Sequence, residues 1–475
     1  MSLRERRPAE APPEAVAREA GENQDGLGFP RRAWAMLTVG LAVSMAVLDG
    51  SISNVALPTI AAGLHARPAA SIWVVNAYQL AITVSLLPLA SLGEILGYQR
   101  IYRAGLALFV AASLACALSH SLLTLALARV LQGFGAAGVM SVNGALIRFI
   151  FPHRMLGRAV GYNTMVVAIS SAAGPTAAAA ILSVATWPWL FAINLPIGAL
   201  ALAVALGSLP ATPRADRRFD APSAALSAAT FGLLIAAIDG VGHAADIRPV
   251  LALLGLTAIC GTLLVRRQLA RPAPLLPVDL LRIPIFALSI LTSIASFAAQ
   301  MLAFVSLPFY IQDTLGRSAV QTGLLLTPWP LTLAVVAPLA GRLSERYPAG
   351  LLGGLGLLTL AAGLLLLAGL PAHPHDIALA WRLALCGAGF GLFQSPNNRT
   401  LLQAAPRDRA GGASGMLSTA RLLGQTCGAA LVAMILALAP STGTRLSVEV
   451  AAGFALVAAL VSSLRIMTRP APAGA

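Results

Sequence analysis

Long stretches of apolar residues, separated by short polar segments, fill the chain from about residue 34 to residue 466. A stretch of about 20 apolar residues is long enough to cross the hydrocarbon core of a membrane as a helix. The stretches are continuously apolar, whereas the strands of a membrane barrel alternate in polarity over about 10 residues. The pattern therefore predicts an all-α polytopic membrane protein. Fourteen spans are predicted, at residues 34–58, 71–93, 104–119, 121–147, 159–182, 187–209, 222–241, 249–265, 284–309, 318–340, 350–370, 376–396, 412–439 and 447–466.

Composition excludes a soluble protein of this length. Only 11% of the 475 residues are charged and the mean hydropathy is +0.80, whereas soluble domains are about 25% charged. Residues 1–33 are polar and lack the apolar core and cleavage site of a signal peptide. We interpret them as a disordered cytoplasmic tail.

The placement of the arginines predicts the orientation. With the N-terminus inside, 25 of the 32 basic residues, all arginine, fall in inner loops and tails, and four fall outside. Basic residues concentrate on the cytoplasmic side of membrane proteins. Both termini are therefore expected in the cytoplasm, in the inner membrane of a bacterial cell. The same placement explains the net charge of +14, because arginines beside anionic lipid headgroups require no nucleic-acid partner.

The chain repeats itself weakly at an offset of about 250 residues. The Leu-Pro pair at 57–58 matches the pair at 307–308, and Arg129 matches Arg382. Two six-helix halves, with a two-helix insert between them, are predicted from this repeat. The predicted parts are the tail 1–33, the first half 34–209, the insert with its flanking loops 210–283, the second half 284–466 and a cytoplasmic tail 467–475.

Asp49 is the strongest candidate for chemistry, because it is the one carboxylate well inside a predicted span. Ionisable groups within the membrane are costly and rare, so each is a functional candidate. Asp49 and Arg129 lie at a similar depth, ~12–14 Å from the outer ends of their helices. A buried Asp that exchanges a proton against an Arg neighbour would couple transport to protons. A static ion pair that fixes helix packing is the alternative.

Other polar and small residues within the spans have two interpretations each. Gly174 and Pro175 interrupt the fifth span, either for function or as an ordinary kink. Four polar side chains either line a cavity or bond one helix to another: Asn54, Tyr78, Gln132 and Gln300. The fourth span carries Gly133 and Gly135, which favour close helix packing.

Two arginine-containing segments lie in the second half. Residues 397–399 (Asn-Asn-Arg) follow Pro396 at the predicted inner end of the twelfth span, and we interpret them as a cytoplasmic cap or gate. Arg421 lies in the inner half of the thirteenth span. It either extends toward the inner surface, pairs with Asp408, or attracts an anionic group.

No motif of an enzyme or of a cofactor site is present. The sequence has no P-loop, HExxH or GxSxG motif, and its four cysteines lack the spacing of metal ligands. No cofactor or metal is therefore expected. Transport must then draw on an ion gradient or on the gradient of the substrate itself.

Together the motifs resemble the fourteen-span branch of the drug:proton antiporters in the major facilitator superfamily. Residues 48–58 (LDGSISNVALP) resemble the proton-site motif, and residues 129–135 (RVLQGFG) resemble the proton-transfer motif. Residues 187–198 (WPWLFAINLPIG) resemble a segment specific to this branch. Residues 92–100 (LGEILGYQR) resemble the superfamily loop motif, with Glu94 in place of Asp and with Gly97 and Arg100 retained. Glu345 occupies the repeat of Glu94, and Gly174–Pro175 resembles part of the antiporter motif.

The resemblance implies alternating access, a proton site at Asp49, and multidrug or toxic-metabolite efflux that confers antibiotic resistance. Expected partners are small lipophilic or monocationic substrates, protons and membrane lipids, without protein or nucleic-acid partners. Two alternatives remain: a proton-coupled importer or metabolite carrier on the same fold, and a non-transporting membrane sensor. Gly174–Pro175 favours export over import, and the retained Asp49–Arg129 pair argues against the sensor.

Overall fold

The computed structural model describes residues 26–467, except residues 217–218, 244–246, 272–273, 275, 372–373 and 407–408. Most of the two predicted tails, 1–33 and 467–475, therefore lies outside the described residues. Within the described part, fourteen helices are long and apolar enough to cross a membrane. This confirms the prediction of an all-helical chain with fourteen spans.

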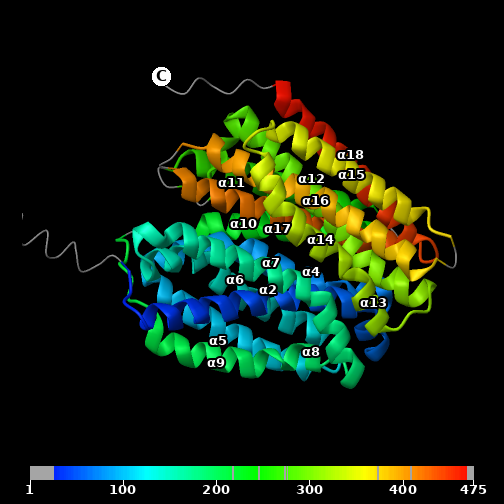
Figure 1. Cartoon of the computed structure of the whole chain (residues 1–475), viewed down its shortest axis with the longest axis horizontal. Helices are drawn as coiled ribbons and strands as arrows, with labels where there is room; N and C mark the ends of the chain where they lie inside the picture. Colours follow the sequence, from blue (N-terminus) through cyan, green and yellow to red (C-terminus); the bar gives the residue numbers. More distant parts are fainter. Residues whose placement is uncertain are drawn as a thin grey trace, which may run out of the picture.

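The first bundle is the lower one in Figure 1, and the second lies above it. The first contains α2 (Arg31–Gly63), α3 (Pro68–Ser71), α4 (Trp73–Leu96), α5 (Tyr98–Ala117), α6 (Leu122–Ile150), η1 (His153–Met155), α7 (Leu156–Val184), α8 (Trp189–Ala192) and α9 (Asn194–Ser208). The second contains η2 (Val278–Arg282), α12 (Pro284–Phe309), η3 (Tyr310–Thr314), α13 (Ala319–Leu326), α14 (Pro328–Leu343), α15 (Ala349–Ala368), α16 (Asp376–Ala404), α17 (Ala410–Leu438) and α18 (Gly443–Met467).

The remaining helices, α10 (Ala221–His243) and α11 (Arg248–Leu269), pack against each other, and α10 also contacts α4 and α17. Asp220, just before α10, accepts hydrogen bonds from Arg267 (2.8 Å) and Ser223 (2.7 Å). Burial opposes the ionisation of Asp220, but these hydrogen bonds outweigh it and lower the pKa of its carboxyl group. The ion pair therefore joins the start of α10 to the end of α11.

The first span differs from its predicted limits. It was expected to end at Pro58, but α2 continues through Pro58 to Gly63. Proline lacks the amide hydrogen of an interior helical residue and leaves a backbone carbonyl without its partner. Proline is nevertheless tolerated in a membrane helix, because neighbouring helices can supply a partner for the freed group. By contrast, the predicted break at residues 119–121 is confirmed. Ser121 caps α6, because its side chain accepts a hydrogen bond from the Thr124 amide and Thr124 bonds back to the Ser121 amide.

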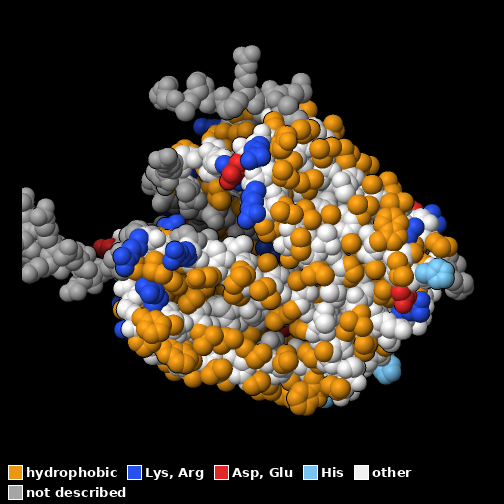
Figure 2. Space-filling model, viewed as in Figure 1, with side chains coloured by type: hydrophobic (Ala, Val, Ile, Leu, Met, Phe, Trp, Pro, Cys, Tyr) orange, Lys and Arg blue, Asp and Glu red, His pale blue; other side chains and the backbone are white. Residues whose placement is uncertain are grey.

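Apolar side chains cover most of the visible flank, as expected for a surface in lipid (Figure 2). Many of the arginines on this face gather at its left side, where the N-terminal end of the described chain also lies (Figures 1 and 2).

The two bundles touch each other through hydrogen bonds between uncharged groups. Near the ends of α2 and α12, Gln312 donates to the carbonyl of Val55 (3.2 Å) and accepts from Thr59 (3.3 Å). Further bonds join Gln79 to Gln425 (3.4 Å), Thr83 to Thr426 (3.2 Å) and Thr176 to Thr327 (2.9 Å).

Candidate functional site

The centre of the first bundle holds a fully buried ion pair. Asp49 of α2 and Arg129 of α6 contact each other through Oδ2 and Nη1, and the two residues are 2% and 0% exposed. The structure therefore brings together Asp49 and Arg129, as expected from their similar predicted depth in the membrane. Such a pair has no water to replace its partners, so each charge depends on the other.

Two amide side chains complete the environment of Asp49. Gln132 and Asn194 both donate to Oδ1 of Asp49, at 2.9 and 3.0 Å. Gln132 also accepts from Arg129 Nη1 (2.6 Å) and donates to Ser113 (2.9 Å). Helices α6 and α9 thus bond directly to the carboxylate on α2, and α5 is joined to it through Gln132, so a change in the charge of Asp49 would affect four helices.

The guanidinium of Arg129 is held by backbone and aromatic groups as well. Its Nε donates to the carbonyl of Val74 (2.9 Å). The guanidinium carbon lies 4.1 Å from the ring centroid of Tyr78 and 5.5 Å from that of Phe191. Tyr78 is fixed in turn by its hydroxyl group, which donates to the carbonyl of Ala46 (3.0 Å). These contacts stabilise the cation independently of the carboxylate.

Asn194 is the main residue of this network that sequence reasoning did not single out. It opens α9 inside an otherwise apolar stretch and is 4% exposed. A lone amide in a membrane span costs less free energy than a charge and is therefore more common. The presence of Asn194 in a span thus indicated function less strongly than the presence of Asp49. Its position within the segment 187–198 was the available clue.

Of the four polar residues predicted to line a cavity or bond one helix to another, only two lie in the network around Asp49. Tyr78 and Gln132 belong to the network around Asp49. Asn54 is buried one to two turns beyond Asp49 on α2, and its Oδ1 has no hydrogen-bond partner among the described residues. Gln300 is buried on α12 in the second bundle. It makes no hydrogen bond with the network in the described part of the chain.

The residues of the predicted loop motif lie where α4 ends and α5 begins, with Glu94 in the last turn of α4 and Arg100 in the first turn of α5. Gly97 has a φ of +100°, a conformation that glycine adopts readily, and it joins the two helices. Glu94 accepts a hydrogen bond from the Ala215 amide at its backbone carbonyl (2.7 Å). Arg100 and Glu345 are exposed. This geometry places the motif at a helix connection rather than at the buried site.

Gly174 and Pro175 lie where α7 meets two neighbours. A Cβ on Gly174 would collide with the side chain of Ser51 on α2. The carbonyl of Pro175 lies against Gly323 of α13, where an added Cβ would also collide. The segment therefore brings α7 close to helices of both bundles.

Gly133 and Gly135 allow α6 to approach two helices. A Cβ on Gly133 would lie 2.6 Å from the Tyr78 carbonyl on α4, and one on Gly135 would lie 2.5 Å from the Phe109 nitrogen on α5. The close packing predicted for these glycines is therefore confirmed.

Replacing Gly135 with Ala is expected to lower the stability of the first bundle by about 1–3 kcal/mol, because the backbone of α5 must move away. Gly144→Ala on the same helix is the matched control, since an added Cβ at Gly144 meets no atom within 4 Å. Thermal unfolding of the two purified variants in detergent measures the difference. Equal midpoints would show that α5 moves aside without cost.

Arg421 lies within α17 and faces the ring of Phe297 on α12, 5.5 Å from its centroid. No ion pair between described residues includes Arg421. Its predicted partner Asp408 lies outside the described residues. The contact with Phe297 places Arg421 within the second bundle, between α17 and α12.

The interpretation of residues 397–399 as a cap at the end of the helix is wrong for Asn397, whereas a role of the segment as a gate stays a prediction. The helix α16 continues to Ala404, and Asn397 is 1% exposed. Asn397 accepts from Arg465 (2.7 Å) and donates to Ser293 (2.8 Å), and Arg465 also donates to Ser289 (3.1 Å). Arg465, at the end of the predicted fourteenth span, is 4% exposed. These side chains form a buried polar cluster that joins α12, α16 and α18.

Comparison with known proteins identifies similar chains over most of the length. Residues 39–429 and 288–475 match the family model described as Major Facilitator Superfamily. The chain is 60% identical over 448 residues to the uncharacterized transporter YebQ of Escherichia coli, covering 94% of this chain and 98% of that one. It is 31% identical to the riboflavin transporter RibZ of Clostridioides difficile, over 83% and 86% of the two chains.

A third relative is the multidrug resistance protein Stp of Mycobacterium tuberculosis, which is 32% identical over 85% of this chain and 75% of that one. Among solved structures, a peptide transporter POT in complex with sulfate has a TM-score of 0.71 at 15% identity, covering 95% and 97% of the two chains. That likeness supports the arrangement of the helices, and the sequence matches support the family.

Proposed function

Because the chain belongs to the major facilitator superfamily of multi-pass membrane transporters, we propose that it is a proton-coupled antiporter that exports small lipophilic or monocationic compounds by alternating access. The observation that carries the proposal is the buried pair of Asp49 and Arg129. The relative named as a multidrug resistance protein supports the efflux of toxic compounds, and with it a role in antibiotic resistance.

Asp49 acts as the proton site in this proposal, and Arg129 as its positioning partner. A proton on Asp49 removes the negative charge that holds Nη1 of Arg129, while Val74, Tyr78 and Gln132 still hold the cation. Proton binding thus weakens the connection between α2 and α6 and leaves the buried cation with neutral partners only, a state that costs free energy and favours a different packing. Deprotonation restores the connection, so the proton state of one residue selects between two packings.

The proposed substrate class follows from the small number of available charges. A desolvated dication requires two opposing charges, because each unpaired charge within the membrane costs several kcal/mol. Asp49 is already in contact with Arg129, Gln132 and Asn194. Neutral or singly charged lipophilic compounds are therefore favoured. The substrate would contact Asn54, Tyr78, Gln132 and Gln300, while Glu94, Gly97, Arg100, Gly133, Gly135, Gly174, Pro175, Glu345 and Arg421 would support the conformational change.

The test is a growth-inhibition panel of toxic compounds, comparing a deletion strain with one that carries the gene again. Compounds to which only the complemented strain is resistant are then tested for uptake into everted membrane vesicles. Accumulation driven by an inward-acid gradient supports export. If no compound separates the strains, or if vesicles accumulate nothing under any gradient, the proposal fails.

Carriage of a metabolite is the second candidate, because the relative RibZ is named as a riboflavin transporter. Uptake into right-side-out vesicles, without accumulation in everted ones, would favour an importer.

We also propose that both termini lie in the cytoplasm, that the protein resides in the bacterial inner membrane, and that the helices divide six, two and six. An enzyme that is active only outside the cell, fused after Thr212 or Arg271, is expected to be silent. The same fusion after Ala245 or Gly316 is expected to be active. The reason is the excess of arginine in the loops assigned to the inside. Activity after Thr212 would contradict the assignment of α10 and α11.

A further inference from the structure

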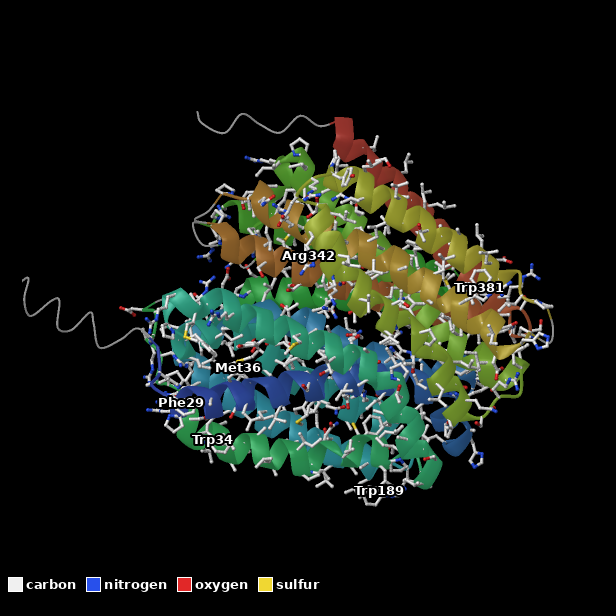
Figure 3. All side chains as sticks on the ribbon, viewed as in Figure 1. Phe29, Trp34, Met36, Trp189, Arg342 and Trp381 are labelled. Atoms are coloured by element: carbon white, nitrogen blue, oxygen red, sulfur yellow. The ribbon has the colours of Figure 1, made fainter. Side chains whose placement is uncertain are left out.

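A groove lies on the flank of the first bundle, beside the first half of α2. It has a volume of about 560 Å³ and is formed by α2, α7 and the segment between α6 and η1. Its lining includes Phe29, Met36, Leu37, Phe151 and Met165. Figure 3 shows Phe29 and Met36 at the left end of this bundle. The volume falls within the ~300–1,000 Å³ that is usual for sites of small ligands.

The groove is apolar along its length and basic at one end. Arg32 is the one charged residue in the lining, and its guanidinium lies 5.8 Å from the ring centroid of Phe151. Arg158 on α7 is exposed and precedes Tyr162 of the lining by one helical turn, so it lies on the same side of α7. No carboxylate is among the described residues that line the groove. An occupant with an apolar chain and a negative head fits this distribution.

The length of the groove matches one membrane leaflet. From Arg32 to Ser44 the helix rises ~18 Å, and half of the hydrocarbon core is ~15 Å thick. Arginines 31 and 32 begin α2 at the end that carries the N-terminus. In the proposed orientation this end faces the cytoplasm, where anionic lipids are attracted to basic residues.

Gly40 leaves room in the groove. An added Cβ there would meet only the side chain of Val166, at 3.9 Å, which is an ordinary contact. Packing between helices therefore does not require glycine at this position. A larger side chain would fill the groove.

We propose that this groove binds one anionic phospholipid of the cytoplasmic leaflet, with an acyl chain along α2 and α7 and the phosphate beside Arg32 and Arg158. The lipid covers apolar side chains that are exposed in the structure, among them Leu37 (43%) and Met165 (52%). It thereby connects the start of α2, the helix that carries Asp49, to α7, which packs against α2 at Ser51.

The test uses the full chain in lipid nanodiscs with a phosphatidylglycerol that carries a photoactivatable group in its acyl chain. Mass spectrometry of the cross-linked peptides is expected to find the label within residues 29–44 and 162–166. Unlabelled phosphatidylglycerol should displace the label, and phosphatidylcholine with the same acyl chains should not. The readout requires neither a transport substrate nor a known orientation in the cell.

Two variants and two controls make the test specific. Gly40→Leu is expected to abolish labelling by filling the groove, and Arg32→Gln to weaken binding about fivefold, the effect of one basic residue beside an anionic surface. Gly255→Leu and Arg266→Gln on α11 are the controls: a Cβ on Gly255 meets nothing, and Arg266 is exposed. If Gly40→Leu does not fold, Arg32→Gln still decides the result.

Three outcomes would overturn the proposal. Equal displacement by phosphatidylcholine would remove the requirement for negative charge. Unchanged labelling in both variants would place the lipid elsewhere. Displacement of the label by an exported compound, but not by phosphatidylglycerol, would make the groove an entry site for substrate.

Discussion

Replacing Asp49 with Asn is expected to reduce proton-driven efflux to the level of passive leak, while the protein still folds and inserts. Asn keeps the shape of the side chain and can still accept hydrogen bonds from Gln132 and Asn194, but it cannot bind and release a proton. The measurement is the efflux of a preloaded fluorescent substrate after cells are energised, at equal amounts of protein in the membrane.

Asp313→Asn provides the matched control, because Asp313 is an exposed carboxylate at the end of η3 and lies outside the network. Its efflux should match that of the wild-type protein. Wild-type rates in the Asp49 variant would remove this residue from the coupling mechanism.

The second large effect concerns Arg129. Arg129→Ala leaves the Asp49 carboxylate buried without its cation, and such a change costs about 3–5 kcal/mol. The same substitution in the Asp49→Asn background should cost much less, because no charge is then left alone. Thermal unfolding of the four proteins in detergent gives the coupling between the two residues.

Transport by the neutral pair Asp49→Asn with Arg129→Gln then separates the two interpretations of this site. If the ion pair only holds α2 against α6, the neutral pair should restore both stability and transport. If Asp49 carries the proton, stability should recover while proton-driven efflux remains absent. Recovery of efflux would therefore favour the static ion pair.

Much of the fold follows from properties that the sequence displays directly. Continuous apolar stretches predict the spans, because lipid provides no partners for an unfolded backbone. Asp49 and Arg129 stood out because charges are rare in such stretches. The limits of helices were harder to predict. The helix α2 continues through Pro58 because packing against neighbouring helices offsets the lost backbone hydrogen bond, and hydropathy carries no information about that packing.

Partnerships between uncharged or terminal residues were not predictable. Asn194 carries no charge, and its contact with Asp49 joins residues 145 positions apart. Arg465 and Asn397 lie near the ends of spans, where a polar residue usually faces water or headgroups. Their burial depends on how α12, α16 and α18 pack, and the polarity pattern of any single helix does not contain that information.

The hydrogen bonds between the bundles differ in kind from the ion pairs within them. Every ion pair between described residues joins groups of the same bundle, or groups at the start of α10 and the end of α11. The bonds that cross between the bundles connect Gln, Thr and backbone carbonyl groups. Among the described residues, the polar contacts that break when the bundles separate are therefore ones that salt screens weakly. The rate of switching between the two faces of the membrane should consequently vary little with ionic strength, and substrate or proton binding would control it instead.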